Sequence, residues 1–415
     1  MLNELHLRHV GPAPRFDIEF AERLNIFTGD NGLGKSFLLD VAWWVLTGSW
    51  AAEQAMPRLE DGHEATISFD TLPRRFPDEE PLIHQKFNYQ QQNWGPRRRR
   101  IKQLKENLCI YAQADGSFAV WDPLRKSVRS VYNFSPNTLW NGLKASRGEV
   151  LCNGLIQDWV NWQQQKNNST FEKFFDIIKR LFQPDEDVHP GVPTRISLKD
   201  VRLIPTMQFP YELLPITNAS AGMKRVLGLA YILMWTWSEH QQAAQISHQY
   251  TSKHLVFLMD EVETHLHPKW QRSLFPSILR AINQLAPEVS IQTIVTTHSP
   301  LVLASVETDF DESRDRLFMF ELKHSEVRLE EFPWSKQGDT VGWLTSEVFG
   351  LKQARSREAE IAIEAAESLM RGASMHTSPA HLRDRDQIHQ ELQRVLPGHD
   401  PFWPRWIVTT GRVSV

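Results

Sequence analysis

Cysteine is scarce in this sequence: among 415 residues only Cys109 and Cys152 occur. They lie far apart, without a Cys-x-x-Cys or a nearby Cys/His spacing, which excludes a disulfide framework and a structural zinc ribbon. Long apolar runs are also missing. The longest, Val226 to Trp237, has 12 residues, whereas a transmembrane helix needs about 18. We therefore expect a reducing compartment and no membrane partner.

A marked excess of one charge is lacking too, since 46 basic and 50 acidic side chains give a formal charge of −4. This balance excludes the overall basic surface of a dedicated nucleic-acid binder, so any such contact must come from a local patch. The first ten residues mix acids and bases and contain no apolar core of a signal peptide, so we expect a cytoplasmic location. Tryptophan, in contrast, is abundant, with 15 residues against 6 tyrosines.

Hydrophobic periodicity divides the chain into five segments and predicts an α/β fold. Residues 1–50 predict strands, a glycine-rich turn and a helix. Residues 51–135, with short strand candidates between turns, predict an antiparallel β arm. Two apolar stripes in residues 136–194 predict a helical insertion. Residues 195–330 form a second α/β stretch, and residues 331–415, with an amphipathic helix and an aromatic tail, predict a C-terminal helical cap.

A glycine-rich phosphate-binding motif joins the first of these strands to a helix. The residues Gly29-Asp30-Asn31-Gly32-Leu33-Gly34-Lys35-Ser36 match G-x-x-x-x-G-K-[ST] without a mismatch. Backbone N–H groups of such a loop and the helix N-terminus bind phosphate oxygens, Lys35 reaches the β- and γ-phosphates, and Ser36 ligates Mg²⁺. Because a strand precedes the motif and a helix follows it, a chance glycine-rich turn is disfavoured. The motif predicts ATP and Mg²⁺ as cofactors, bound at Gly29, Asn31, Gly32, Gly34, Lys35 and Ser36.

Two carboxylates follow an apolar strand later in the chain. Leu255 to Met259 is a continuous apolar run, typical of a buried parallel strand, and it ends at Asp260 and Glu261. Ligands of open α/β sheets bind at such strand ends. The pattern predicts that Asp260 acts on Mg²⁺ through water and that Glu261 is the general base for the attacking water.

Two further sequence elements narrow the class of ATP-binding protein that the motifs indicate. A β-branched run from Ile291 to Thr297 ends at His298, which lies at the tip of the next predicted strand. A lone histidine at such a position is usually structural. Because this one follows the acidic strand by some 30 residues, we treat it as a candidate site residue. Upstream, Ser220 and Gly222 precede an apolar helix and predict a second anion site, close to Lys224.

In this order, the motifs resemble the soluble ABC-type ATPases of the SMC/RecF/OLD class. Three segments have amino-acid sequences similar to those of AAA-family ATPases of bacterial anti-phage systems: Ser220 to Arg225, Asp260 to Arg272 and Thr297 to Ser305. They resemble in particular the PtuA-like ATPases of Septu and of retron operons, which accompany an HNH nuclease. The resemblance is strong over residues 1–50 and 195–330.

The resemblance implies an ATPase head that pairs head to tail with a second copy, as a dimer or higher oligomer. Ser220, Gly222 and Lys224 of one subunit would cap the γ-phosphate held by the other, and His298 would be the switch histidine that contacts it. It also implies an effector nuclease, of HNH type, encoded separately. A glutamine that senses Mg²⁺ should lie between the two motifs, and both Gln85 and Gln157 fit by position.

Two patterns outside the motifs bear on partners. Arg97 to Arg100 form a dense basic cluster, for which a nucleic-acid contact and a solvated loop are equally supported. The tail around Trp403 and Trp406 either packs on its own domain or docks a partner. Asp384-Arg385-Asp386 could suggest a nuclease motif, but its polar flanks predict a solvated helix instead.

We therefore interpret the chain as the ATPase subunit of an anti-phage system that regulates an effector nuclease. A RecF- or SMC-like ATPase of DNA repair or chromosome maintenance is the alternative. The SMC form is disfavoured, because the residues between Ser36 and Ala219 contain no heptad-bearing arm.

Overall fold

The structure, a computed structural model, describes residues 1–58, 63–71, 82–95, 107–125, 131–182, 187–372, 379 and 381–411. These residues form two units, Met1–Lys336 and Gln337–Val415. The larger unit carries all the motifs identified in the sequence up to His298.

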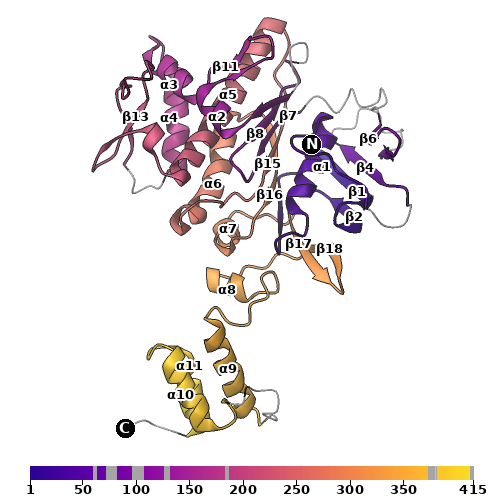
Figure 1. Cartoon of the computed structure of the whole chain (residues 1–415), viewed down its shortest axis with the longest axis vertical. Helices are drawn as coiled ribbons and strands as arrows, with labels where there is room; N and C mark the ends of the chain where they lie inside the picture. The colour runs from indigo at the N-terminus through magenta and orange to yellow at the C-terminus, as the bar shows by residue number, and fades with distance from the viewer. Residues whose placement is uncertain are drawn as a thin grey trace. The chain divides into compact units, whose positions relative to one another are not determined.

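An eight-stranded sheet forms the centre of the larger unit (Figure 1). Its five inner strands run parallel to one another, in the order β17, β3, β16, β15 and β7, and three antiparallel strands complete the edges. The strands are β3 (Leu24–Gly29), β7 (Leu108–Ala112), β8 (Phe118–Trp121), β9 (Val131–Phe134), β15 (His254–Met259), β16 (Ser290–Thr296), β17 (Asp315–Lys323) and β18 (Glu326–Phe332). Parallel strands bring their carboxyl ends to one edge, so the residues that follow β3, β15 and β16 are neighbours.

Helix α1 (Lys35–Thr47) packs between this sheet and a second, antiparallel one. The second sheet has five strands in the order β2 (Ala13–Glu19), β1 (Leu2–Val10), β4 (Thr66–Thr71), β5 (Ile83–Asn88) and β6 (Asn93–Trp94). Trp43 and Trp44 of α1 share one apolar core with Leu258 of β15 and Leu7 of β1. The helix is therefore buried on nearly all sides, which explains why its sequence is almost continuously apolar.

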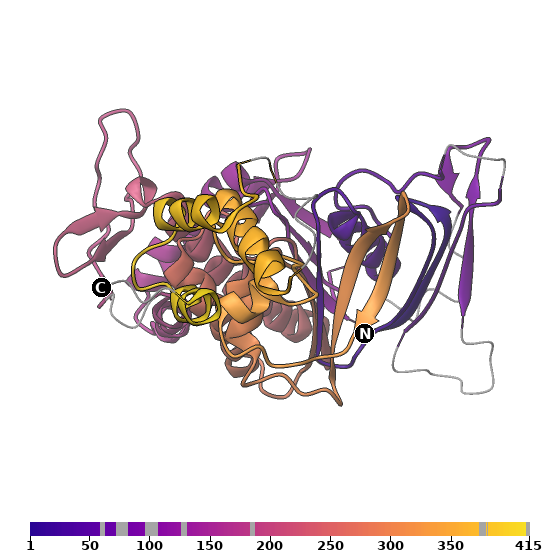
Figure 2. The same ribbon diagram turned by 90° about the horizontal axis from the view of Figure 1, so that it is seen from below.

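Residues 51–135, predicted as one antiparallel arm, are divided between the two sheets. Strands β4 to β6 extend the sheet of β1 and β2, whereas β7 to β9 form one edge of the main sheet (Figures 1 and 2). Every residue of β7 is buried, because the strand lies next to β15. Short strand patterns specify faces rather than pairing partners, so the sequence alone could not separate the two groups. The predicted α/β class with a P-loop sheet is confirmed.

Helices cover the face of the main sheet opposite α1 (Figure 1). Successive side chains of β15 point to opposite faces of the sheet. Leu258 therefore packs toward α1, whereas Met259 lines a small gap with Val226 and Leu274 of the opposite helices. These helices are α2 (Pro136–Asn141), α3 (Leu155–Gln164), α4 (Ser169–Leu181), α5 (Ala221–Ser247), α6 (Pro268–Leu285) and α7 (Pro300–Val306). Three of them, α2, α3 and α4, lie within residues 136–194, and a short break before Ser169 separates α3 from α4.

Small strands and turns connect these helices. The hairpin β10 (Leu143–Lys144) and β11 (Val150–Cys152) precedes α3, and a three-stranded sheet precedes α5. That sheet contains β12 (His189–Pro190), β13 (Thr206–Gln208) and β14 (Leu213–Pro215), followed by the 3-10 turn η2 (Ile216–Asn218). The described part of the chain has no helix that is both long and apolar enough to cross a membrane.

The smaller unit consists of α8 (Thr340–Thr345), α9 (Arg357–Met370), α10 (Arg385–Val395) and α11 (Phe402–Thr410). Trp406 is buried in the core of this unit, and its indole N–H donates to Nδ1 of His389 at 3.0 Å. The aromatic tail thus packs on its own domain. Asp384 accepts a bond from the backbone N–H of Gln387 at the start of α10, which confirms the helical interpretation of that segment.

Candidate nucleotide-binding and hydrolysis site

The phosphate-binding motif forms the turn between β3 and α1. Gly29, Gly32 and Gly34 have φ values of +127°, +77° and +103°, which side chains rarely tolerate. A Cβ on Gly29 would lie 2.2 Å from the carbonyl oxygen of Phe320, so the close approach of β17 also requires glycine there. The turn leaves Asn31, Gly32 and Ser36 exposed at the N-terminus of α1.

Lys35 lies beneath this turn and is 5% exposed. Its ammonium group donates to the carbonyl oxygens of Gly29 at 2.9 Å and Asp30 at 2.7 Å. Burial lowers the pKa of Lys35 to about 8, although the charges of Glu261 and Asp260 oppose the shift. The two backbone carbonyls hold the ammonium group at the turn, where a phosphate would replace them as its partner.

Asp260 and Glu261 occupy the end of β15, next to the end of β16. The hydroxyl of Thr296 donates to Oδ1 of Asp260 at 2.6 Å and accepts from the backbone N–H of Glu261 at 2.9 Å. Asp260 is 5% exposed, whereas the side chain of Glu261 is 36% exposed. Glu261 has a φ of +46°, a sparsely populated conformation for a residue with a side chain, and such strain is typical of functional sites.

His298 follows β16 and faces Glu261. Its Nε2 lies 3.6 Å from Oε1 of Glu261. Burial and the neighbouring charge of Lys35 lower the pKa of His298, so the imidazole is largely neutral at pH 7. The backbone N–H of His298 donates to Oε1 of Glu263 at 2.5 Å, and burial raises the pKa of that carboxyl. The structure thus gathers the predicted residues Lys35, Asp260, Glu261 and His298 at one edge of the sheet.

Ser36 and Asp260 offer the oxygen atoms that the predicted Mg²⁺ would need. Thr296 engages only Oδ1 of Asp260, and neither Oδ2 nor the Ser36 hydroxyl has a hydrogen bond or ion pair within the residues described. Mg²⁺ prefers carboxylate, hydroxyl and water oxygens. This donor set therefore fits the ion.

The signature segment forms the start of α5. Ser220 caps the helix by accepting from the backbone N–H of Met223 at 3.3 Å. A Cβ on Gly222 would lie 3.2 Å from the carbonyl oxygen of His265, so this turn packs closely against the loop that follows Glu261. Lys224, which the sequence grouped with Ser220 and Gly222, lines a separate cavity.

Arg225 was not predicted as a site residue. Its guanidinium donates to the carbonyl oxygens of Ala114 at 2.9 Å, Glu261 at 3.2 Å and Asp260 at 3.3 Å. Burial lowers its pKa, and the surrounding carboxylates, Glu263 first among them, oppose the shift. Arg225 thus connects the first turn of α5 to the ends of β15 and β7. Only the fold reveals this contact, since a cation beside a helix start has no distinctive sequence signal.

Gln113 is the glutamine that the fold places near the site. It directly follows Ala112, whose carbonyl oxygen accepts from the backbone N–H of Asp260 at 2.8 Å. Gln85 lies instead in β5 of the second sheet, and Gln157 lies on α3 and bonds to Asn161. The signal in the sequence was the apolar run from Leu108 to Ala112, which ends directly before this residue. The basic cluster Arg97–Arg100 lies outside the described residues.

A phosphate-binding turn and an acidic strand end at one edge of a parallel sheet are the parts of an ATPase site, and the chain is accordingly an enzyme of ATP hydrolysis. Residues 169–304 match the family model described as "AAA domain, putative AbiEii toxin, Type IV TA system".

Three known proteins show what the chain is similar to. The Septu protein PtuA of Bacillus thuringiensis is 21% identical over 86% of this chain and 86% of its own length. The retron Vc95 probable ATPase of Vibrio cholerae serotype O1 biovar El Tor is 43% identical over 13% of this chain and 9% of its own length. The solved SMC head domain from Thermotoga maritima aligns with 80% of this chain and 99% of its own, at 15% identity and a TM-score of 0.38. The sequence matches relate the chain to ATPases of anti-phage systems.

Proposed function

We propose that the protein is the ATPase subunit of an anti-phage defence system and that it controls a separately encoded effector nuclease, of HNH type. The observation that carries this proposal is the similarity to Septu PtuA, which extends over 86% of both chains rather than over the ATPase motifs alone. No cluster of three or more His, Cys, Asp and Glu side chains suited to a metal occurs among the described residues. Nuclease activity is therefore assigned to a partner.

ATP would be bound by the turn from Gly29 to Ser36, with the ammonium of Lys35 on the β- and γ-phosphates. Mg²⁺ held by Ser36 and, through water, Asp260 would neutralise the phosphate charge. Gln113, beside Asp260, takes the role of the glutamine that senses the ion. Glu261 would accept a proton from the water that attacks the γ-phosphorus, and the bond to the β–γ bridging oxygen breaks as ADP leaves.

We propose that a second chain caps the γ-phosphate of the bound ATP. Ser220 and Gly222 lie at the N-terminus of α5, where unpaired N–H groups favour an anion. In a head-to-tail pair they would contact the γ-phosphate bound by the partner chain, with His298 of the binding chain on its other side. ATP would then hold the pair together, and hydrolysis would release it.

Size-exclusion chromatography with light scattering tests this pairing. Glu261→Gln keeps the side chain's shape but removes the base, so with Mg²⁺ and ATP it should elute as a dimer or larger assembly. Lys35→Ala should bind no ATP and stay in the nucleotide-free state. Glu326→Gln, a change at an exposed position of β18, is the matched control. Unchanged ATP turnover in the Glu261→Gln variant would contradict the assignment of the base.

The defence role needs a separate test in cells. We expect a neighbouring open reading frame to encode a protein with an HNH motif, and this protein should copurify with the ATPase. The two proteins together should reduce phage plaque numbers, whereas neither should do so alone. The Lys35→Ala variant should lose protection. Protection by the ATPase alone would contradict the proposed division of labour.

A further inference from the structure

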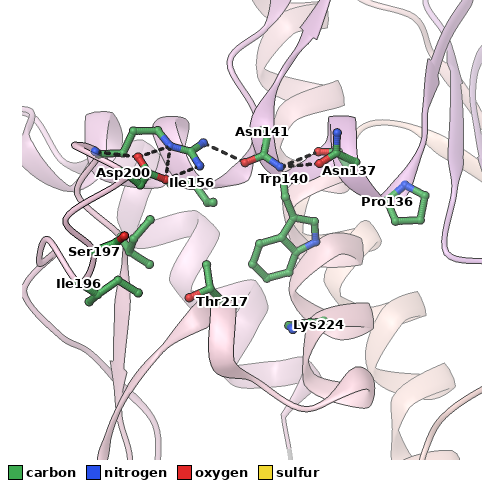
Figure 3. A pocket seen from close by; sticks show the side chains of 12 residues that line it. Pro136, Asn137, Trp140, Asn141, Ile156, Ile196, Ser197, Asp200, Thr217 and Lys224 are labelled. Carbon is green, nitrogen blue, oxygen red and sulfur yellow. Dashed lines mark hydrogen bonds and ion pairs between the residues drawn. The ribbon is translucent and has the colours of Figure 1, made fainter.

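The cavity that Lys224 lines has a volume of about 580 Å³ and lies beside the start of α5. Its walls come from α2, α3, the segment 196–204, η2 and the first turn of α5, as Figure 3 shows. It shares no residue with the turn from Gly29 to Ser36. Its volume is within the range of about 300–1,000 Å³ that is typical of small-molecule sites.

One aromatic ring dominates the cavity. The indole of Trp140 projects into it above Thr217 and Lys224 (Figure 3). Ile156 and Ile204, each 3% exposed, add apolar surface. The indole N–H of Trp140 makes no hydrogen bond with any residue that the structure describes. A flat ring on an apolar wall, with a free donor at its edge, favours a planar aromatic ligand.

A chain of hydrogen bonds fixes the rim of the cavity. Asp200 holds the guanidinium of Arg202 at 2.7 Å, Arg202 donates to the amide oxygen of Asn141 at 2.9 Å, and Asn141 donates to the amide oxygen of Asn137 at 2.8 Å. Figure 3 draws these bonds along one side of the cavity. The bonds join the segment 196–204 to α2, so the rim is shaped before a ligand arrives, which lowers the entropic cost of binding.

The charge of the lining is positive. Asp200 and Arg202 neutralise each other, whereas Lys224 has no hydrogen bond or ion pair from its ammonium group among the described residues. One unpaired cation therefore remains, together with the amide N–H groups of Asn137. A ligand that satisfies the cavity needs a flat ring for Trp140 and an anionic group for Lys224.

We propose that this cavity binds a nucleotide, with its base stacked on Trp140 and its phosphate on the ammonium of Lys224. A free mononucleotide and one nucleotide of a single strand present the same chemistry to the cavity. Stacking on an aromatic side chain tolerates any base, so the cavity recognises the nucleotide class rather than one sequence.

The position of Lys224 gives this site a means of regulation. Its backbone N–H donates to the carbonyl oxygen of Ser220 at 2.8 Å, in the same helical turn that carries Gly222. A nucleotide on Lys224 therefore acts on the turn that caps the partner's ATP. This consequence rests on the proposed head-to-tail pairing, whereas binding to the cavity does not.

The test measures binding in the Lys35→Ala background, so that the ATP site contributes nothing. Fluorescence anisotropy follows a fluorescein-labelled hexathymidylate, and competition uses 5′-mononucleotides or an abasic strand of equal length. Trp140→Leu and Lys224→Ala should each weaken binding by about tenfold or more. Trp140→Phe keeps an aromatic ring, and Lys173→Ala removes an exposed lysine of α4; both should bind within about twofold of the parent.

Each outcome is decisive. Competition by mononucleotides identifies a free nucleotide as the ligand, and binding of the base-bearing strand alone identifies a strand. Equal binding of the abasic strand, or no change in the Trp140→Leu and Lys224→Ala variants, overturns the proposal. A failure of every probe to bind also overturns the proposal. In that case the cavity could still bind a protein, which loss of a protein partner in the Trp140→Leu variant would reveal. None of these results depends on ATP turnover, so the proposed ATPase pairing stands or falls separately.

Discussion

The hydroxyl of Thr296 donates a 2.6 Å hydrogen bond to the carboxylate of Asp260, from the neighbouring strand. The same hydroxyl accepts the backbone N–H of Glu261. One buried side chain therefore orients both acidic residues of the catalytic edge. It also supports the unusual backbone of Glu261, whose φ of +46° few residues adopt.

Thr296→Val should damage both stability and hydrolysis. Valine has the same shape but leaves the Glu261 N–H and Asp260 Oδ1 without this partner, at a cost of about 1–3 kcal/mol in the free energy of unfolding. ATP turnover should fall as well. Chemical denaturation and a phosphate-release assay measure the two effects. Thr236→Val is the matched control, since the buried Thr236 hydroxyl has no hydrogen-bond partner in the part of the chain that the structure describes. An equal loss in both variants would contradict this account.

Glu263 should act on hydrolysis through His298. Glu263→Ala removes the acceptor of the His298 N–H, so kcat should fall by about tenfold or more as the imidazole loses its position. The KM for ATP should change little, because Glu263 does not lie in the phosphate-binding turn. Glu263→Gln keeps an oxygen at this point and should restore most of the rate. Steady-state kinetics of the two variants measure this difference. Equal kcat values for Glu263→Ala and Glu263→Gln would refute the positioning role.

Asp40→Asn should stabilise the protein at neutral pH. Burial raises the pKa of Asp40 to about 6 from 3.8, although a hydrogen bond from Tyr111 opposes the shift. The folded state thus holds this proton more tightly than the unfolded state, and stability falls as pH rises from about 4 to 6. Asparagine removes that loss, so the variant should gain about 1 kcal/mol at pH 7.5, the side chain being half-buried.

The pH dependence of that gain is the diagnostic result. Near pH 4 the Asp40 carboxyl of the folded protein is protonated and as uncharged as the asparagine amide, so the two proteins should unfold at similar denaturant concentrations. Asp176→Asn, at an exposed position of α4, should show no gain at either pH. A gain for Asp40→Asn that is equal at pH 4 and pH 7.5 would point to packing instead of ionisation.

Both cysteines should be unreactive in the native protein. Burial raises the pKa of Cys109 and of Cys152 to about 12, so hardly any thiolate exists at pH 8. Mass spectrometry after iodoacetamide treatment should find neither residue modified under native conditions and both modified in denaturant. Rapid labelling of Cys152 in the native state would mean that its contact with Tyr231, 2.9 Å from sulfur to phenol oxygen, opens readily.

Trp406→Ala should unfold the smaller unit rather than remove a docking surface. The side chain is 1% exposed, and loss of a buried tryptophan costs about 3–5 kcal/mol. Limited proteolysis should then cut within residues 337–415. Trp403, only partly buried, offers the comparison, since its indole N–H bonds to Pro397 at 2.8 Å and Trp403→Ala should have the smaller effect.

Sequence motifs were sufficient where the chemistry depends on neighbours in the chain. The turn from Gly29 to Ser36 follows its strand directly, and Asp260 and His298 each end an apolar strand, so their shared edge followed from the rule for parallel sheets. The same reasoning predicted α/β layers. It required no knowledge of which strands pair.

Contacts between distant segments could not be predicted. Strand β7 lies beside β15 although some 140 residues separate them, and this pairing places Gln113 next to the end of β15 while Gln85 lies in the second sheet. The partners of Arg225 are backbone carbonyls, which carry no sequence signal. The direction in which the Lys224 side chain points depends on how α5 is rotated about its own axis. The closeness of Lys224 to Ser220 in the sequence does not determine it.

Arg225 has a consequence for how a pair of chains would respond to ATP. Its guanidinium joins the start of α5 to the carbonyls of Asp260 and Glu261, so we expect a shift of one segment to be passed on to the other within each chain. In the proposed head-to-tail pair these two segments would belong to different composite sites. Occupancy of one site would thus be felt at the other, and ATP saturation should be sigmoidal, with Arg225 as the mechanical link between the two halves.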